Sequence, residues 1–167
     1  MLPAIGLLAA LAFPWPAAAI DVPQTRQEFV KVVAAGEGGT SETLVIDQPF
    51  DKVYALLQER VPACLDVKVQ RTAYVGYVER SSSDHNPTLR LVGKGRAEFT
   101  LQVVHNPRGV GHTPPPGGLY VMAADLRSID GGRTEAVLYR PNIGFKKIAV
   151  SLKQWFAGNP AACPKLK

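Results

Sequence analysis

The first nineteen residues of this 167-residue chain contain no charged side chain. They hold an apolar run over residues 5–13, then Pro14 and Pro16, and finally three alanines over residues 17–19. A membrane-spanning helix needs about 20 apolar residues, so this shorter run argues against a stable membrane anchor. The layout is typical of a secretory signal peptide.

Ala17 and Ala19 place small side chains where signal peptidase requires them, at the third and first positions before a cut after Ala19. We therefore expect residues 1–19 to be a signal peptide, and a chain starting at Ile20 to be periplasmic or secreted. The basic segment that usually precedes the apolar run is missing, and a buried N-terminal helix is the alternative.

Cysteine is scarce, with only Cys64 and Cys163 in the whole chain. Neither has a second Cys or a His at metal-ligand spacing, which argues against a structural metal. Two buried free thiols are the alternative, but in an oxidising compartment two lone cysteines more often pair. We expect a structural disulfide that ties the C-terminal segment to the middle of the chain.

Motifs of catalysis and metal binding are absent as well. The three histidines, His85, His105 and His112, are too separated for a zinc site, and we predict no metal and no cofactor. No Gly-x-Ser-x-Gly elbow is present, and residues 81–85 bring Ser, Asp and His together in sequence only, which predicts a polar turn. Residues 93–96 lack the rest of a phosphate-binding loop and predict a hairpin turn. The sequence thus favours a non-catalytic protein, and we assign no catalytic residue.

Charge is distributed unevenly over the rest of the chain, whose formal net charge is +5. Up to Ser83 there are 7 basic and 9 acidic residues, whereas from Asp84 onward there are 12 basic and 5 acidic residues. The basic half is consistent with attraction to anionic lipid head groups, cell-wall polymers or acidic partners, and a solvated surface is the alternative. Export and the lack of a recognised motif argue against nucleic acid.

No internal repeat or long linker divides the remainder, so we predict one domain over residues 20–167. Thr25 and Glu28 form a capping box before a short helix that the glycines after residue 35 end. Residues 42–47 predict a strand, and Pro49 then opens a helix that we expect Pro62 to close.

From residue 65 to residue 140 the apolar period changes from 3.6 to two, which predicts half-buried antiparallel strands. Residues 130–132, Asp-Gly-Gly, predict a hairpin turn. After Pro141 one broad apolar face indicates a closing helix; it comprises Phe145, Ile148, Ala149, Leu152, Trp155 and Phe156.

This order of elements, together with the stretch DQPFDKVYALL at residues 47–57, resembles the START-like (SRPBCC, helix-grip) superfamily, here as an exported bacterial member. The resemblance implies an α+β fold. A curved antiparallel sheet of about six to seven strands would grip a long C-terminal helix, with short N-terminal helices beside it. It also implies that an apolar ligand lies between sheet and helix, and it carries no catalytic triad with it.

Alternation along the strands and the helix selects the side chains that we expect to line such a cavity: Phe99, Leu101, Tyr120, Met122, Leu138, Ile148, Leu152 and Trp155. The alternative is that they fill a solid core. Residues 106–118, with three consecutive prolines, predict either an exposed hairpin loop or a lid over the cavity mouth. In a lid, Arg108 and His112 would meet a polar head group.

Two functions follow from these expectations. The first is a non-catalytic exported binding protein that holds a lipid or other apolar small molecule between the sheet and the C-terminal helix. The alternative is a cell-envelope interaction protein whose basic half docks an anionic partner and which has no cavity. A third and weaker reading is an enzyme of the cyclase or hydrolase kind, for which the sequence shows no acid–base pair. The volume beneath the C-terminal helix discriminates the first two.

Overall fold

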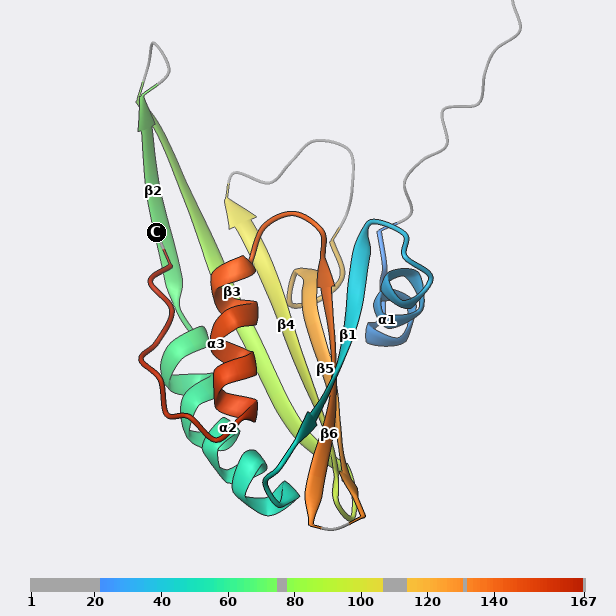
Figure 1. Cartoon of the computed structure of the whole chain (residues 1–167). Helices are drawn as coiled ribbons and strands as arrows, with labels where there is room; N and C mark the ends of the chain where they lie inside the picture. The colour runs from blue at the N-terminus through green and yellow to red at the C-terminus, as the bar shows by residue number, and fades with distance from the viewer. Residues whose placement is uncertain (1–21, 75–77, 107–113, 131, 167) are drawn as a thin grey trace, which may run out of the picture.

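The computed structural model describes residues 22–74, 78–106, 114–130 and 132–166, and it has an α+β architecture (Figure 1). Three helices and six strands follow one another in the order α1 (Arg26–Ala34), β1 (Gly39–Ile46), α2 (Phe50–Leu65), β2 (Lys68–Tyr74), β3 (Val78–Gly93), β4 (Arg96–Asn106), β5 (Leu119–Ile129), β6 (Arg133–Pro141) and α3 (Lys146–Phe156). The expected signal peptide at residues 1–19 lies outside the described residues. Within them, no helix is both long enough and apolar enough to cross a membrane.

The six strands form one open antiparallel sheet in the order β1-β6-β5-β4-β3-β2. Helices α2 and α3 lie over one face of this sheet, whereas α1 packs against β1, β5 and β6 on the opposite face (Figure 1). The sequence prediction of an antiparallel sheet with a C-terminal helix packed on it is confirmed.

Helix α1 begins as the sequence predicts. The Thr25 hydroxyl accepts a hydrogen bond from the Glu28 backbone N–H at 3.2 Å, and the Glu28 carboxylate accepts one from the Thr25 N–H at 3.3 Å. This reciprocal pair satisfies donors that the first turn of a helix leaves free. Phe29 and Val33 then face the sheet and are buried.

Helix α2 corrects the prediction at Pro62, which lies inside the helix instead of closing it. Proline lacks the N–H that would bond to the carbonyl four residues earlier, so the helix loses one hydrogen bond there. Burial of Cys64 and Leu65 carries the helix through one more turn, and Leu65, expected at the start of a strand, is its last residue.

Residues 81–85 correct a second prediction, because they form part of the 16-residue strand β3 and not a polar turn. Ser81 and Ser83 pair with Arg71 and Val69 of β2, and Ser83 also pairs with His105 of β4. Strands on both sides therefore hold this polar segment in the sheet. The hairpin at residues 93–96 is confirmed, with Gly95 at φ +64°. Strands β5 and β6 pair up to Ile129 and Arg133, as a hairpin requires, although Gly131 lies outside the described residues.

The two cysteines form a disulfide, with 5.0 Å between the Cα atoms of Cys64 and Cys163. Cys64 lies in the last turns of α2, so the bridge fixes the segment that follows α3 against that helix. Disulfides persist in oxidising surroundings, and the bridge therefore indicates an extracytoplasmic location.

Candidate ligand-binding pocket

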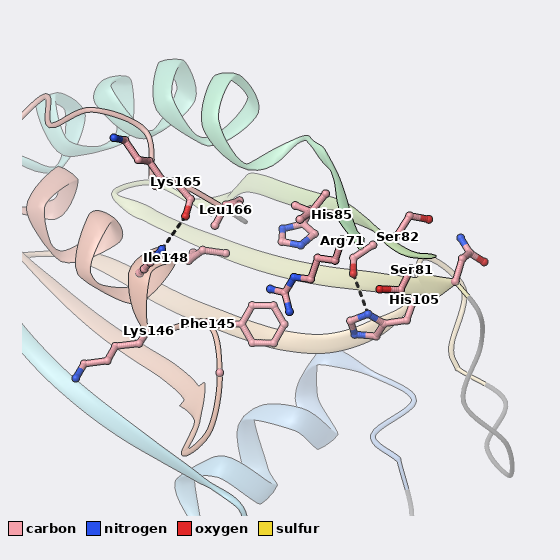
Figure 2. A pocket seen from close by; sticks show the side chains of 15 residues that line it. Arg71, Ser81, Ser82, His85, His105, Phe145, Lys146, Ile148, Lys165 and Leu166 are labelled. Atoms are coloured by element: carbon pink, nitrogen blue, oxygen red, sulfur yellow. Dashed lines mark hydrogen bonds between the residues drawn. The ribbon is translucent and has the colours of Figure 1, made fainter. Parts of the chain in front are cut away.

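A pocket of about 640 Å³ lies at the N-terminal end of α3, between that helix, strands β2 to β4 and the C-terminal segment (Figure 2). Its lining comes from five parts of the chain: Val69 and Arg71 of β2; Ser81, Ser82, Ser83 and His85 of β3; His105 and Asn106 of β4; Gly144 to Ile148 at the start of α3; and Lys165 with Leu166. The volume falls within the range of small-molecule sites.

The start of α3 shapes one wall of this pocket. Gly144 and Phe145 both have left-handed backbone angles, φ +82° and +51°, which turn the chain sharply from β6 into the helix. Phe145 is the N-cap residue, and no side chain caps this helix end. Strain of this kind at a non-glycine residue is typical of functional sites.

His85 is the buried polar residue of the pocket wall, with 6% of its surface exposed. Its Nδ1 atom is buried and has no hydrogen-bond partner among the described residues. The ring lies against Phe145, with 6.2 Å between ring centroids, and Figure 2 shows it next to the Arg71 guanidinium. Burial lowers the pKa of His85, and Coulombic interactions with His105 and Arg71 lower it further, against a smaller opposing effect of Asp84. These effects favour the neutral form of the His85 ring.

Ser83 and His105 meet at the more open side of the pocket, where the Ser83 hydroxyl lies 3.0 Å from His105 Nδ1. A serine beside an imidazole is part of a nucleophilic site, but that chemistry also needs a group that orients the imidazole. Among the described residues no carboxylate bonds to His105. These residues also contain no group of three or more His, Cys, Asp or Glu side chains that could hold a metal ion.

The C-terminal segment forms the outer wall. Lys147 Nζ donates a hydrogen bond of 3.2 Å to the Lys165 carbonyl, and Leu166 packs against the main core cluster. Cys163 anchors this segment through its bridge to α2. The disulfide thus holds two lining residues in place.

Most of the residues that we expected to line a cavity do not line this pocket. Seven of them belong to the main core cluster between sheet and helices, each at most 1% exposed: Phe99, Leu101, Met122, Leu138, Ile148, Leu152 and Trp155. Of these seven, Ile148 alone lines the pocket. Their role as ligand contacts stays a prediction. The pocket described above lies at one end of this interior.

Tyr120 departs from the alternation that selected it. Leu101 of β4 pairs with Met122 of β5, but Gln102 pairs with Tyr120, so Val121 is an extra residue that forms a bulge. The bulge turns Tyr120 to the other face, where it stacks on Phe29 of α1 with 6.2 Å between ring centroids. The expectation that it shares a face with Met122 is wrong for this reason.

Arg108 and His112 lie outside the described residues, as does most of the predicted loop or lid. Sequence reasoning missed Arg71, His85 and the Lys165–Leu166 segment as site residues. No sequence pattern marked His85, because its burial within the 81–85 run becomes visible only in the structure.

No known protein family matches the chain, and no curated protein matches it. Among solved structures, a hypothetical protein jhp0584 from Helicobacter pylori aligns with 94% of this chain and 97% of its own at 10% identity and a TM-score of 0.42. The protein CV1439 from Chromobacterium violaceum aligns over 78% of this chain and 99% of its own, at 12% identity and a TM-score of 0.36.

The di-domain ARO/CYC StfQ of the steffimycin biosynthetic pathway aligns with 72% of this chain at 14% identity and a TM-score of 0.33, and this chain covers 42% of it. These are loose likenesses, and none of them identifies an activity.

Proposed function

We propose that this protein is a non-catalytic, exported binding protein that takes a lipid or other apolar small molecule in the pocket at the N-terminal end of α3. The observation that carries the proposal is the pocket itself, about 640 Å³ in volume, which sheet, helix and C-terminal segment enclose together. Its apolar lining consists of Val69, Phe145, Ile148 and Leu166. Burying apolar ligand surface against such a wall contributes roughly 25 cal/mol per Å².

The fold supports this proposal. The order of strand β1, helix α2, an antiparallel meander and a C-terminal helix on the sheet is that of the START-like superfamily, and we propose that the chain is an exported member of it. The disulfide and the uncharged residues 1–19 support a periplasmic or secreted location.

The test is native mass spectrometry of the protein purified from its own host. We expect a fraction of the molecules to carry a co-purified small molecule that organic extraction releases. A bare polypeptide mass, together with failure of apolar fluorescent probes to bind, would contradict the proposal.

A pocket-filling substitution locates the binding. Ser81→Trp places an indole in the pocket and should reduce probe binding at least tenfold. The matched control is Ser41→Trp on the edge strand β1, where the serine is exposed and the pocket is remote. Equal binding by the two variants would place the ligand elsewhere.

A further inference from the structure

The charges around the pocket are of one sign. Arg71, Lys146, Lys147 and Lys165 all line it, and no Asp or Glu does. Among the described residues none of these four side chains takes part in an ion pair. The nearest carboxylate along β3, that of Asp84, pairs with Lys68 at 3.4 Å.

Some basic side chains outside the pocket are paired with carboxylates. Arg26, Arg90, Arg127 and Lys153 each lie within 4 Å of a carboxylate on a neighbouring strand or helix. Arg80, Arg96, Arg133 and Arg140 of the sheet take part in no ion pair among the described residues. What distinguishes the pocket is that four unpaired basic side chains line one space with no carboxylate among them.

Two further features face the same space. His85 is 94% buried in the pocket wall with an unpartnered ring nitrogen, next to Arg71 (Figure 2). The first turn of α3 contributes Lys146, Lys147 and Ile148 to the lining, and no side chain caps it. The free N–H groups and the positive end of an 11-residue helix attract an anion.

We infer that the ligand is an amphiphile with a single anionic head group, a carboxylate or a phosphate, and that Arg71 is its principal charge partner. This inference rests on the function proposed above. The apolar chain lies against Val69, Phe145, Ile148 and Leu166, and the head group lies between Arg71 and the start of α3. The arginine fork suits both head groups because it donates two parallel hydrogen bonds to either.

Titration calorimetry with four twelve-carbon probes below their micellar concentrations tests the head group. Dodecanoate and dodecyl phosphate should bind at least tenfold more tightly than dodecanol, and dodecyltrimethylammonium should bind more weakly than dodecanol. If dodecanol binds as tightly as dodecanoate, the inference is wrong and the proposed function stands. If none of the four binds, the proposed function itself fails.

A binding measurement with inorganic phosphate tests whether the ligand is an amphiphile or a small anion. We expect no measurable binding, because burial of the apolar chain supplies most of the affinity. Phosphate that binds as tightly as dodecyl phosphate would overturn the inference in favour of a small-anion site.

Arg71→Gln tests the assigned partner. It should weaken dodecanoate binding about tenfold and leave dodecanol binding within twofold, which also shows that the variant is folded. The matched control is Arg80→Gln on the neighbouring strand, because Arg80 is exposed and does not line the pocket. This variant should bind dodecanoate and dodecanol as tightly as the unchanged protein does. Equal losses in the two variants would mean that net charge, and not Arg71, sets the preference.

Discussion

His85 links the pocket to the pH dependence of stability. Its pKa is lowered in the folded protein by burial and by the nearby charges of His105 and Arg71, whereas in the unfolded chain it returns to the ordinary value of 6.5. Below pH 6.5 the unfolded state therefore binds the proton more readily than the folded state. Stability conferred by the neutral ring is present above pH 6.5 and is lost as the pH falls below it.

We predict that the free energy of unfolding declines as the pH falls from 6.5 toward the lowered pKa of His85, and that His85→Asn flattens this decline. Urea denaturation at half-unit pH intervals measures both. An unchanged slope in the variant would show that other groups cause the decline. Asp84 acts in the opposite direction on the same ring, so Asp84→Asn should steepen the decline.

The buried side chain of Thr134 makes a hydrogen bond whose contribution to stability can be measured. It is fully buried, and its hydroxyl donates a 2.8 Å hydrogen bond to the Gln48 carbonyl, which joins the start of β6 to the turn before α2. Thr134→Val keeps the shape and removes the donor, and it should lower the free energy of unfolding by about 1 kcal/mol. Thr43→Val on the exposed side of β1 is the control and should change it by under about 0.5 kcal/mol. Equal effects in chemical denaturation would contradict this reading.

At the scale of elements, local signals predicted the helices better than the strands. The capping box at Thr25 acts within one turn, and the apolar face of α3 follows a strict helical period, so both could be read directly. Pro62 was misread because burial of Cys64 and Leu65 outweighs one lost hydrogen bond. The polar residues 81–85 form a strand because β2 and β4 pair with them, which no local pattern reveals.

Strands β4 and β5 approach closely at Gly118. A Cβ atom there would lie 2.5 Å from the Val103 carbonyl carbon and oxygen, and φ is +102°. Gly118→Ala should therefore lower the free energy of unfolding by about 3 kcal/mol or more. Gly36→Ala is the control, since φ is +81° but a Cβ would meet open space, and it should cost roughly 1–2 kcal/mol. Thermal and urea unfolding of both variants check the difference, and equal losses would contradict the close approach.

The disulfide connects stability to the pocket. Replacing Cys64 and Cys163 together by alanine should lower the free energy of unfolding by about 2–5 kcal/mol, since the bridge closes a loop of 99 residues. It should also weaken binding of apolar probes, because Lys165 and Leu166 lose their anchor. Probe titrations of oxidised protein and of this double variant measure the second effect, and unchanged binding would show that the C-terminal segment holds its place without the bridge.

At the scale of the whole molecule, part of the positive charge in the second half of the sequence lies around the pocket. The basic half of the chain includes α3 and the C-terminal segment, and these bring Lys146, Lys147 and Lys165 to one pocket. The composition shows an excess of positive charge, but it cannot show that basic side chains from separate segments line one pocket. That arrangement depends on the fold, which brings the start of α3 beside the C-terminal residues and β2 (Figure 1).

The sequence predicted the antiparallel sheet, the closing helix and the cysteine pair, but it did not predict the pocket at the start of α3. Alternation identifies which side chains face inward, and it found most of the core correctly. It cannot tell a filled interior from a hollow one, and it fails beyond the bulge at Val121, which moved Tyr120 to the other face. The pocket lies where packing of sheet against helix ends, and its residues come from five separate segments.

The most direct test of a ligand pocket at the start of α3 is a map of backbone amide chemical shifts by NMR as dodecanoate is added. We predict that the largest changes fall on residues 81–85, 146–148 and 165–166 and on Arg71. Changes centred on α1 and Tyr120, or no change up to saturating dodecanoate, would contradict the account.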